Sequence, residues 1–332
     1  MRFGLQLHGT FPITAYGDLA QRAERLGFSD LTVHDVLLRR PVWPLLADIA
    51  QATNTVTIGP NVTHPYLQHP AVIAANAAHL DELSGGRVVV GLGRGSMYHV
   101  VGQRLPAGVD GLVAAAKVVR ALLTGDESGV GNSDDRFQLA AGTALAFGAR
   151  RKIPIHFGVF GERGVRSAGV AADGVRAAAQ WDPAYTVEIR RWLDESASAA
   201  GRDPATMTLI AENWTCVHTD RELARGTART LLAPFLPHLG RMLEFYAIPD
   251  EEVAAARAAS AGDAAAAEAI SDTTVDRFMA AGDAADLRRG IERMADAGLD
   301  HLSFSGVLGP DPELALSILG EVCAPLADDA RS

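Results

Sequence analysis

A strand-helix-strand unit within residues 55–96 constrains the fold of this chain more than any other stretch. Its elements follow one another as a strand, a turn, a helix, a second strand and a glycine turn, at residues 56–59, 60–65, 70–83, 87–92 and 93–95. The helix is followed by Gly85 and Gly86, and glycine is the usual residue just beyond a helix end. A unit of this length favours a right-handed crossover between two parallel strands.

The same alternation of strand and helix recurs over the rest of the chain. Further strands are predicted at residues 2–8, 30–34, 152–159, 173–177, 206–217 and 302–305. Further helices are predicted at residues 18–26, 42–53, 108–123, 161–172, 183–200, 284–297 and 313–326. Eight strands that alternate with helices predict an α/β fold, the (β/α)8 TIM barrel. A doubly wound sheet is the alternative, but it would not usually need eight units.

Two stretches interrupt the alternation, and we expect them to be excursions from a single domain over residues 1–332. Residues 125–150 are rich in Gly, Asp and Ser, with one possible short strand around Phe137, which favours a surface loop. Residues 219–282 are mostly alanine-rich and are broken by prolines at 234, 237 and 249. That stretch is too long for one helix, so it is predicted to be a helical insertion.

Charge and cysteine content narrow the class of protein. The net charge of −10 argues against a nucleic-acid partner or an anionic membrane, since both need a basic face. No apolar run reaches the roughly 18–20 residues that cross a bilayer. Cys216 and Cys323 lie far apart and outside any CxxC pattern, which suits a reducing cytoplasm. We expect a cytoplasmic protein with a small-molecule partner.

Barrels of this class carry their sites where the strands end, so the residues that follow the predicted strands are the candidates. These candidates are His8, His34, Asp35, Asn61, Val62, Gly93, Arg94, Gly95, Gly161, Glu162, Arg163, Gln180, Trp181, Ser303 and Ser305. The ten histidines include no HExxH pattern and no pair at helical spacing, so no metal site is predicted.

Two glycine turns point to a ligand that carries phosphate. The turn at 93–95 lacks the dinucleotide-binding fingerprint, yet its glycines would let a ligand approach the backbone and Arg94 could hold an anion. A plain tight turn with a surface arginine explains it equally well. Residues 161–163 open a helix, whose free N–H groups, dipole and Arg163 favour an anion. An ordinary helix start is the alternative there.

His34 and Asp35 form a candidate acid/base pair at the end of the second predicted strand. Imidazole titrates near neutral pH, which makes it useful for moving protons. The alternative is a loop histidine beside a helix-capping aspartate.

Several motifs resemble those of the luciferase-like flavin and deazaflavin oxidoreductases. They are Asn-Val-Thr-His-Pro at 61–65, His-Pro-Ala-Val at 69–72, Leu-Asp-Glu-Leu-Ser-Gly-Gly-Arg at 80–87 and Gly-Leu-Gly-Arg-Gly at 91–95. Further landmarks of that family stand in the usual order at 1–9, 22–35, 153–175 and 198–205. The chain most resembles the methylenetetrahydromethanopterin-reductase-like branch, many members of which use coenzyme F420.

The resemblance implies a TIM barrel with an insertion that binds coenzyme F420, or FMN as the alternative. It implies a non-prolyl cis peptide at Asn61-Val62 behind the cofactor ring, the cofactor phosphate on residues 161–163, and residues 93–95 beside the cofactor. Asp35 would contact the ring. The implied reaction is hydride transfer between coenzyme F420 and a C=C, C=N or C=O bond of a small substrate. An FMNH2-dependent monooxygenase and a non-catalytic flavin-binding or inactive barrel are the alternatives, and a homodimer is the family expectation.

One position departs from the family pattern. Deazaflavin enzymes of this family carry Asp-His after the second strand, whereas this chain has Asp35 followed by Val36. Val36 therefore stands where the family's proton-donating histidine would be. His34 or His8 could take its place, or the reaction needs no protein acid there.

Overall fold

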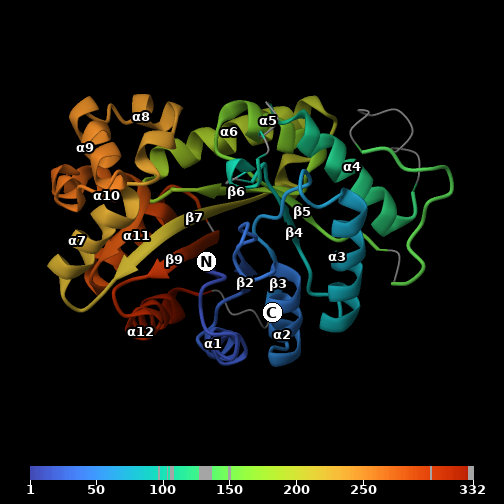
Figure 1. Cartoon of the computed structure of the whole chain (residues 1–332), viewed down its shortest axis with the longest axis horizontal. Helices are drawn as coiled ribbons and strands as arrows, with labels where there is room; N and C mark the ends of the chain where they lie inside the picture. The colour runs from blue at the N-terminus through green and yellow to red at the C-terminus, as the bar shows by residue number, and fades with distance from the viewer. Residues whose placement is uncertain are drawn as a thin grey trace. The chain divides into compact units, whose positions relative to one another are not determined.

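The computed structural model describes residues 1–95, 98–102, 104, 108–126, 137–148, 151–299 and 301–327 (Figure 1). The chain divides into two compact units. The N-terminal unit comprises Leu5–Arg176 with Arg191–Leu209. The C-terminal unit comprises Met1–Gly4, Ala177–Arg190 and the chain from Ile210 onward.

Parallel strands form the sheet of the N-terminal unit. Its strands are β1 (Arg2–Leu7, from Leu5 on), β2 (Asp30–Val33), β3 (Thr57–Pro60), β4 (Val90–Leu92), β5 (Ile155–Gly158) and β6 (Gly174–Ala178, up to Arg176). Val33 at the end of β2 aligns with Pro60 at the end of β3, and Leu92 aligns with Phe157 of β5. A parallel bridge between Thr63 and Leu92 connects the β3 and β4 ends. The carboxyl ends of β2 to β5 therefore lie along one edge.

Helices cover this sheet in sequence order. They are α1 (Ala15–Arg25), α2 (Val42–Ala52), α3 (Pro70–Ser84), α4 (Asp110–Thr124) and α5 (Glu162–Ala171), and each packs against the next (Figure 1). The sequence sets the limits of α3 locally. His69 accepts a hydrogen bond from the Ala71 N–H, Pro70 fills the first turn, and Gly85 adopts the left-handed conformation beyond the end.

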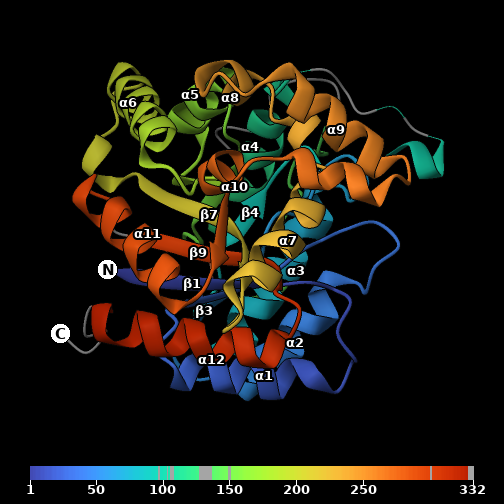
Figure 2. The same ribbon diagram turned by 90° about the vertical axis from the view of Figure 1, so that its left-hand side faces the viewer.

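Among the described residues, the C-terminal unit contains strands that lie wholly or mostly within it, together with α-helices. The strands are β7 (Thr208–Val217, from Ile210 on), β8 (Met279–Gly282) and β9 (His301–Leu308). The helices are the first half of α6 (Pro183–Ala199), α7 (Arg221–Leu232), α8 (Arg241–Phe245), α9 (Asp250–Ser260), α10 (Asp272–Phe278), α11 (Ala284–Asp296) and α12 (Pro312–Cys323). Strands β8 and β9 both pair with β7 in parallel, and α7, α10 and α11 all pack against β8 (Figure 2).

The hydrogen-bonded strand order is β3-β2-β1-β9-β7-β6-β5-β4, with β8 beside β7. The eight strands of this path are those predicted from the sequence. Strand β8 was not predicted and corrects the expectation that residues 219–282 form only helix. Met279 and the two alanines after it have no strand preference of their own, so their pairing with β7 decides their conformation.

The stretch 125–150 is described only in part. Residues 127–136 and 149–150 lie outside the described residues, so the expected loop is not tested there. Residues 137–148 contain no strand, and Phe137 lies in a bend, which corrects the short strand expected around it. Phe137 is buried instead, with its ring 6.2 Å from that of Tyr66 and 5.9 Å from that of His69.

Candidate active site

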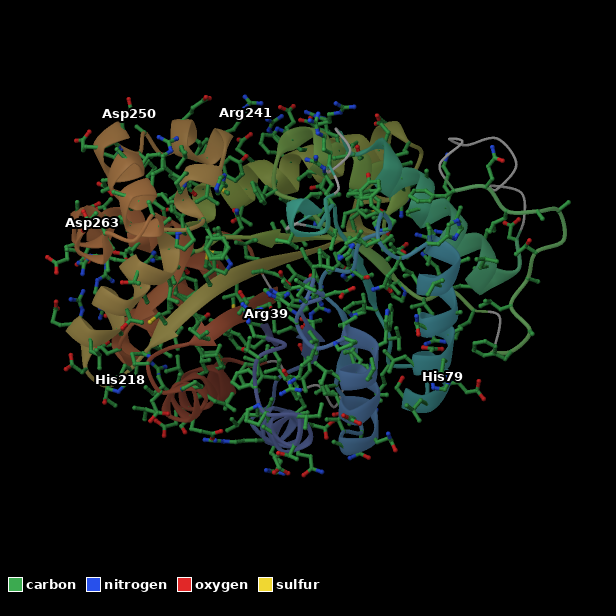
Figure 3. The ribbon with its side chains drawn as sticks, in the orientation of Figure 1. Arg39, His79, His218, Arg241, Asp250 and Asp263 are labelled. Atoms are coloured by element: carbon green, nitrogen blue, oxygen red, sulfur yellow. The ribbon has the colours of Figure 1, made fainter. Side chains whose placement is uncertain are left out.

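Two histidines meet at the carboxyl ends of β1 and β2. The ring centroids of His8 and His34 lie 4.5 Å apart. The backbone N–H of His34 donates to the Leu7 carbonyl at 3.1 Å. Burial, and then the charge of His8, lower the pKa of His34 from 6.5 to about 3. Burial, and then the charge of Arg39 on the loop after β2 (Figure 3), lower the pKa of His8. Both rings are therefore neutral at physiological pH.

The Asp35 carboxylate is held by neutral hydrogen-bond donors from the loop after β3. Its Oδ2 accepts from the Thr63 hydroxyl at 2.7 Å and from the Gln68 amide at 3.0 Å. Trp43 of α2 donates its indole N–H to Gln68 Oε1 at 3.0 Å, which turns the amide nitrogen of Gln68 toward Asp35. Among the residues that the structure describes, the other oxygen, Oδ1, has no hydrogen-bond partner, so it is available as an acceptor for a ligand.

His64 lies next to this carboxylate and is buried. Burial lowers the pKa of His64, although the charge of Asp35 acts in the opposite direction. His64 stands inside the Asn-Val-Thr-His-Pro motif at 61–65 but was not among the candidate site residues, although it shares the electrostatic environment of Asp35.

Val62 joins the ends of three strands. The Asn61-Val62 peptide bond is cis, as the family resemblance predicted. A Cβ built on Gly93 would lie 2.3 Å from Val62 Cγ2, and one built on Gly158 would lie 2.4 Å from Val62 Cγ1. Both positions must therefore be glycine for the valine to fit where β4 and β5 end. The buried Gln6 amide donates to the Asn61 carbonyl and ties this turn to β1.

The amino end of α5 forms a second polar group. Gly161 caps the helix with extended backbone and offers no side chain to the first-turn N–H groups. Among the described residues, nothing lies within 4 Å of a Cβ added at Gly161, so no described atom crowds this cap position. Arg163 is 70% exposed and pairs with Asp110, the first residue of α4, at 3.2 Å. Glu162 pairs with Arg166 at 3.0 Å. This helix end can hold an anion.

The predicted site residues fall into two groups, with the turn at 93–95 following β4. His8, His34 and Asp35 belong to the first group, and Gly161, Glu162 and Arg163 to the second. Arg94 and Gly95 are half-buried, and Gly95 has a positive φ of 74°. The sequence did not single out Gln6, Trp43, Thr63, Gln68 or Asp110. Thr63 stands inside a quoted family motif, which was the available signal, whereas Gln68 and Trp43 meet only through tertiary packing.

The described residues lack two features that would indicate another class of protein. In the part of the chain that the structure describes, no three His, Cys, Asp or Glu residues are placed to hold a metal ion. None of the described helices has both the length and the apolar character needed to span a membrane.

Comparisons with known proteins extend over nearly the whole chain. A family model described as luciferase-like monooxygenase matches residues 1–301. The chain is 26% identical to the 5,10-methylenetetrahydromethanopterin reductase of Methanolobus tindarius, over 97% of this chain and 99% of the relative. It is 26% identical to a solved F420-dependent secondary alcohol dehydrogenase in complex with an F420-acetone adduct, with a TM-score of 0.80 and 99% of each chain covered.

The fold comparison is stronger than the sequence comparison. The solved coenzyme F420-dependent tetrahydromethanopterin reductase from Methanopyrus kandleri matches with a TM-score of 0.86 at 24% identity, over 98% of this chain and 99% of that one. Together with the strand order, this match confirms the predicted (β/α)8 barrel class.

Proposed function

This chain belongs to the luciferase-like monooxygenase family, and on that premise we propose that it is an oxidoreductase that transfers a hydride between coenzyme F420 and a small organic substrate. The substrate bond is C=C, C=N or C=O, or its reduced form. The observation that carries the proposal is that two groups follow strands of the same sheet. One is the hydrogen-bonded carboxylate of Asp35, and the other is the amino end of α5 at Gly161, which has no side-chain cap.

The residues present fit the cofactor. Its phosphate needs N–H donors and a cation, and the amino end of α5 offers uncapped N–H groups beside Arg163. Its planar ring must lie close to the protein backbone. Gly93, which lies next to Val62, has no side chain that would keep the ring away. Asp35 Oδ1 is the acceptor for a polar edge of the ring. When bound, the deazaflavin supplies or takes up the hydride.

His8 and His34 act as neutral hydrogen-bonding groups in this proposal. The lowered pKa of His34, about 3, leaves almost none of it protonated at neutral pH. His34 therefore does not replace the missing family histidine as a cationic acid. The role of both histidines is to orient a substrate oxygen or nitrogen beside the apolar side chain of Val36.

Titration of the purified apoprotein with coenzyme F420 and with FMN tests the proposed function. We expect micromolar binding of coenzyme F420 and weaker binding of FMN. Binding of FMN alone would overturn the proposal in favour of an FMNH2-dependent monooxygenase, and the family's description names a monooxygenase. Binding of neither would favour the non-catalytic barrel.

Replacement of Arg163 tests the phosphate position. Arg163→Ala removes a charge-assisted contact, so we expect the dissociation constant of coenzyme F420 to rise about tenfold. Arg166→Ala, one turn further along α5, is the matched control and should leave it unchanged, because Arg166 pairs with Glu162 and Glu195. Equal affinities of wild type and Arg163→Ala would remove the phosphate from this helix.

The remaining features of the proposal are a single domain with excursions at 125–150 and 219–282, a homodimer and a cytoplasmic location. They come from the family resemblance and the composition, and they stay predictions.

A further inference from the structure

A cavity lined by charged and apolar side chains lies at the opposite ends of the strands, away from the candidate active site. It has a volume of about 350 Å³ and is lined by the ends of α4 and α5 together with Lys152, Asp173 and Arg202. Lys152 comes just before β5, and Asp173 comes directly before β6. The cavity therefore lies at the amino ends of these strands, all within the N-terminal unit.

Three cations surround one carboxylate in this cavity. Asp173 Oδ1 lies 2.8 Å from Lys152 Nζ and 3.6 Å from an Arg202 nitrogen, and Asp173 Oδ2 lies 2.9 Å from an Arg120 nitrogen. The Ile155 N–H also donates to Oδ2, at 3.0 Å. Burial acts to raise the pKa of Asp173, but the contacts with Lys152, Ile155 and Arg120 outweigh it and lower the pKa overall. The carboxylate stays ionised, so among the described residues that line the cavity three positive charges and one negative charge leave an excess of two.

The arginines have a structural explanation that the lysine lacks. Arg120 donates to the Ala171 carbonyl at 3.3 Å and Arg202 to the Gly169 carbonyl at 2.9 Å, so both satisfy the carboxyl end of α5. The Lys152 side chain is 64% exposed, and its ion-pair partner among the described residues is Asp173. Lys152 is one of two lysines in a chain of net charge −10, the other being Lys117. Its charge is thus in excess of what the fold needs.

We propose that this cavity binds a small phosphate monoester. Such a group carries close to two negative charges at pH 7, which matches the excess charge. Lysine binds phosphate as a point charge and arginine as a fork of N–H donors, and both are present. The volume lies within the range of small-molecule sites, and the exposed Val170 offers an apolar wall for the ester's carbon chain. This site is separate from the proposed cofactor phosphate, because it lies at the other end of the ten-residue α5, about 15 Å along the helix.

Isothermal titration of the full chain with glycerol 3-phosphate tests the proposal. We expect Lys152→Gln to weaken binding at least fivefold and Lys152→Arg to retain most of it. Lys117→Gln, which removes the other, exposed lysine on α4, should leave binding unchanged. Arg163→Ala should also leave it unchanged, which separates this cavity from the cofactor site. The exposure of Lys152 predicts that its variants keep the melting temperature within about 2 °C.

Three results would overturn the proposal. They are the absence of glycerol 3-phosphate binding by the wild-type chain at millimolar concentration, equal binding by wild type and Lys152→Gln, and loss of binding in Arg163→Ala with Lys152→Gln unaffected. The last result would place the ester at the cofactor end of α5. None of these outcomes depends on whether coenzyme F420 or FMN is the cofactor.

Discussion

Asp35 and Asp173 are carboxylates at opposite edges of the same sheet, and their partners differ in kind. Asp35, at the carboxyl edge, accepts from a hydroxyl and an amide, both neutral. Asp173, at the amino edge, is surrounded by three cations. Neutral donors hold a carboxylate in place without neutralising its charge. Three cations neutralise the charge of one carboxylate and leave the group with a net positive charge. Asp35 therefore presents a negatively charged acceptor to a ligand. The cavity at Asp173 is positively charged, and its carboxylate stabilises the fold.

The largest effect that this comparison predicts is on catalysis. Asp35→Asn keeps the size of the side chain and an oxygen for Thr63 but removes the charge. We expect kcat/KM for F420-dependent turnover to fall about 100-fold, equivalent to about 2.7 kcal/mol of transition-state stabilisation, with little change in melting temperature. Steady-state kinetics and a thermal melt of the same preparation measure both.

The outcome at Thr63 and Gln68 sharpens this prediction. Thr63→Val and Gln68→Leu keep the charge of Asp35 but each removes one hydrogen bond that positions the side chain. These variants should therefore lose less activity than Asp35→Asn. If Asp35→Asn kept full activity, the carboxylate would be only a structural part of the loop and the contrast with Asp173 would disappear.

The second effect is on stability. Asp173→Asn leaves three cations facing one another, so we expect the free energy of unfolding to fall by about 2 kcal/mol while kcat/KM stays within twofold. Because the folded-state pKa of Asp173 lies below its ordinary value of 3.8, its contribution is present above pH 3.8 and is lost as the pH falls through the folded pKa. Urea unfolding at pH 7, 5 and 3 should show the difference between wild type and variant shrinking at the lowest pH. A constant difference would mean that the charge of Asp173 is not what stabilises the fold.

The effect that is smallest at pH 7 concerns the neutral histidine pair beside Asp35. The folded-state pKa of His34, about 3, lies below the ordinary 6.5, so between these values the unfolded chain takes up a proton that the folded chain does not. His34 therefore reduces stability as the pH falls through this window, by at most about 1.4 kcal/mol per pH unit. The unfolding free energy of His34→Gln should fall less steeply between pH 7 and 4. His79→Gln, at an exposed position on α3 (Figure 3), should keep the wild-type slope.

The sequence predicted the positions of site residues better than their partners. Parallel strands end at one edge, so knowing that His34 follows β2 and that Asn61 follows β3 was enough to bring them to the same edge. The hydrogen bonds of Asp35 could not be predicted, because they depend on how α2 places Trp43 against Gln68. The cluster around Asp173 draws on four separate stretches of the chain. Asp173 and Arg202 stand inside family landmarks, but nothing in those landmarks indicates that they meet Arg120 and Lys152.

Most of the fold could also be predicted from local sequence patterns. The prediction failed where tertiary pairing decides the structure. Apolar runs bounded by glycine or proline marked eight strands, including β4 before Gly93 and β5 before Gly161. Strand β8 has a short, alanine-rich sequence next to helices, so only its pairing with β7 reveals it.

Val62 and the two glycines that touch it have a consequence for how sequences of this kind diverge. The methyl groups of Val62 occupy the volume that side chains at 93 and 158 would need, so the three positions share one fixed volume. A relative can gain a side chain at either glycine only if position 62 becomes smaller. Among relatives, these three positions, which lie up to 96 residues apart in the sequence, should therefore covary as a single trait.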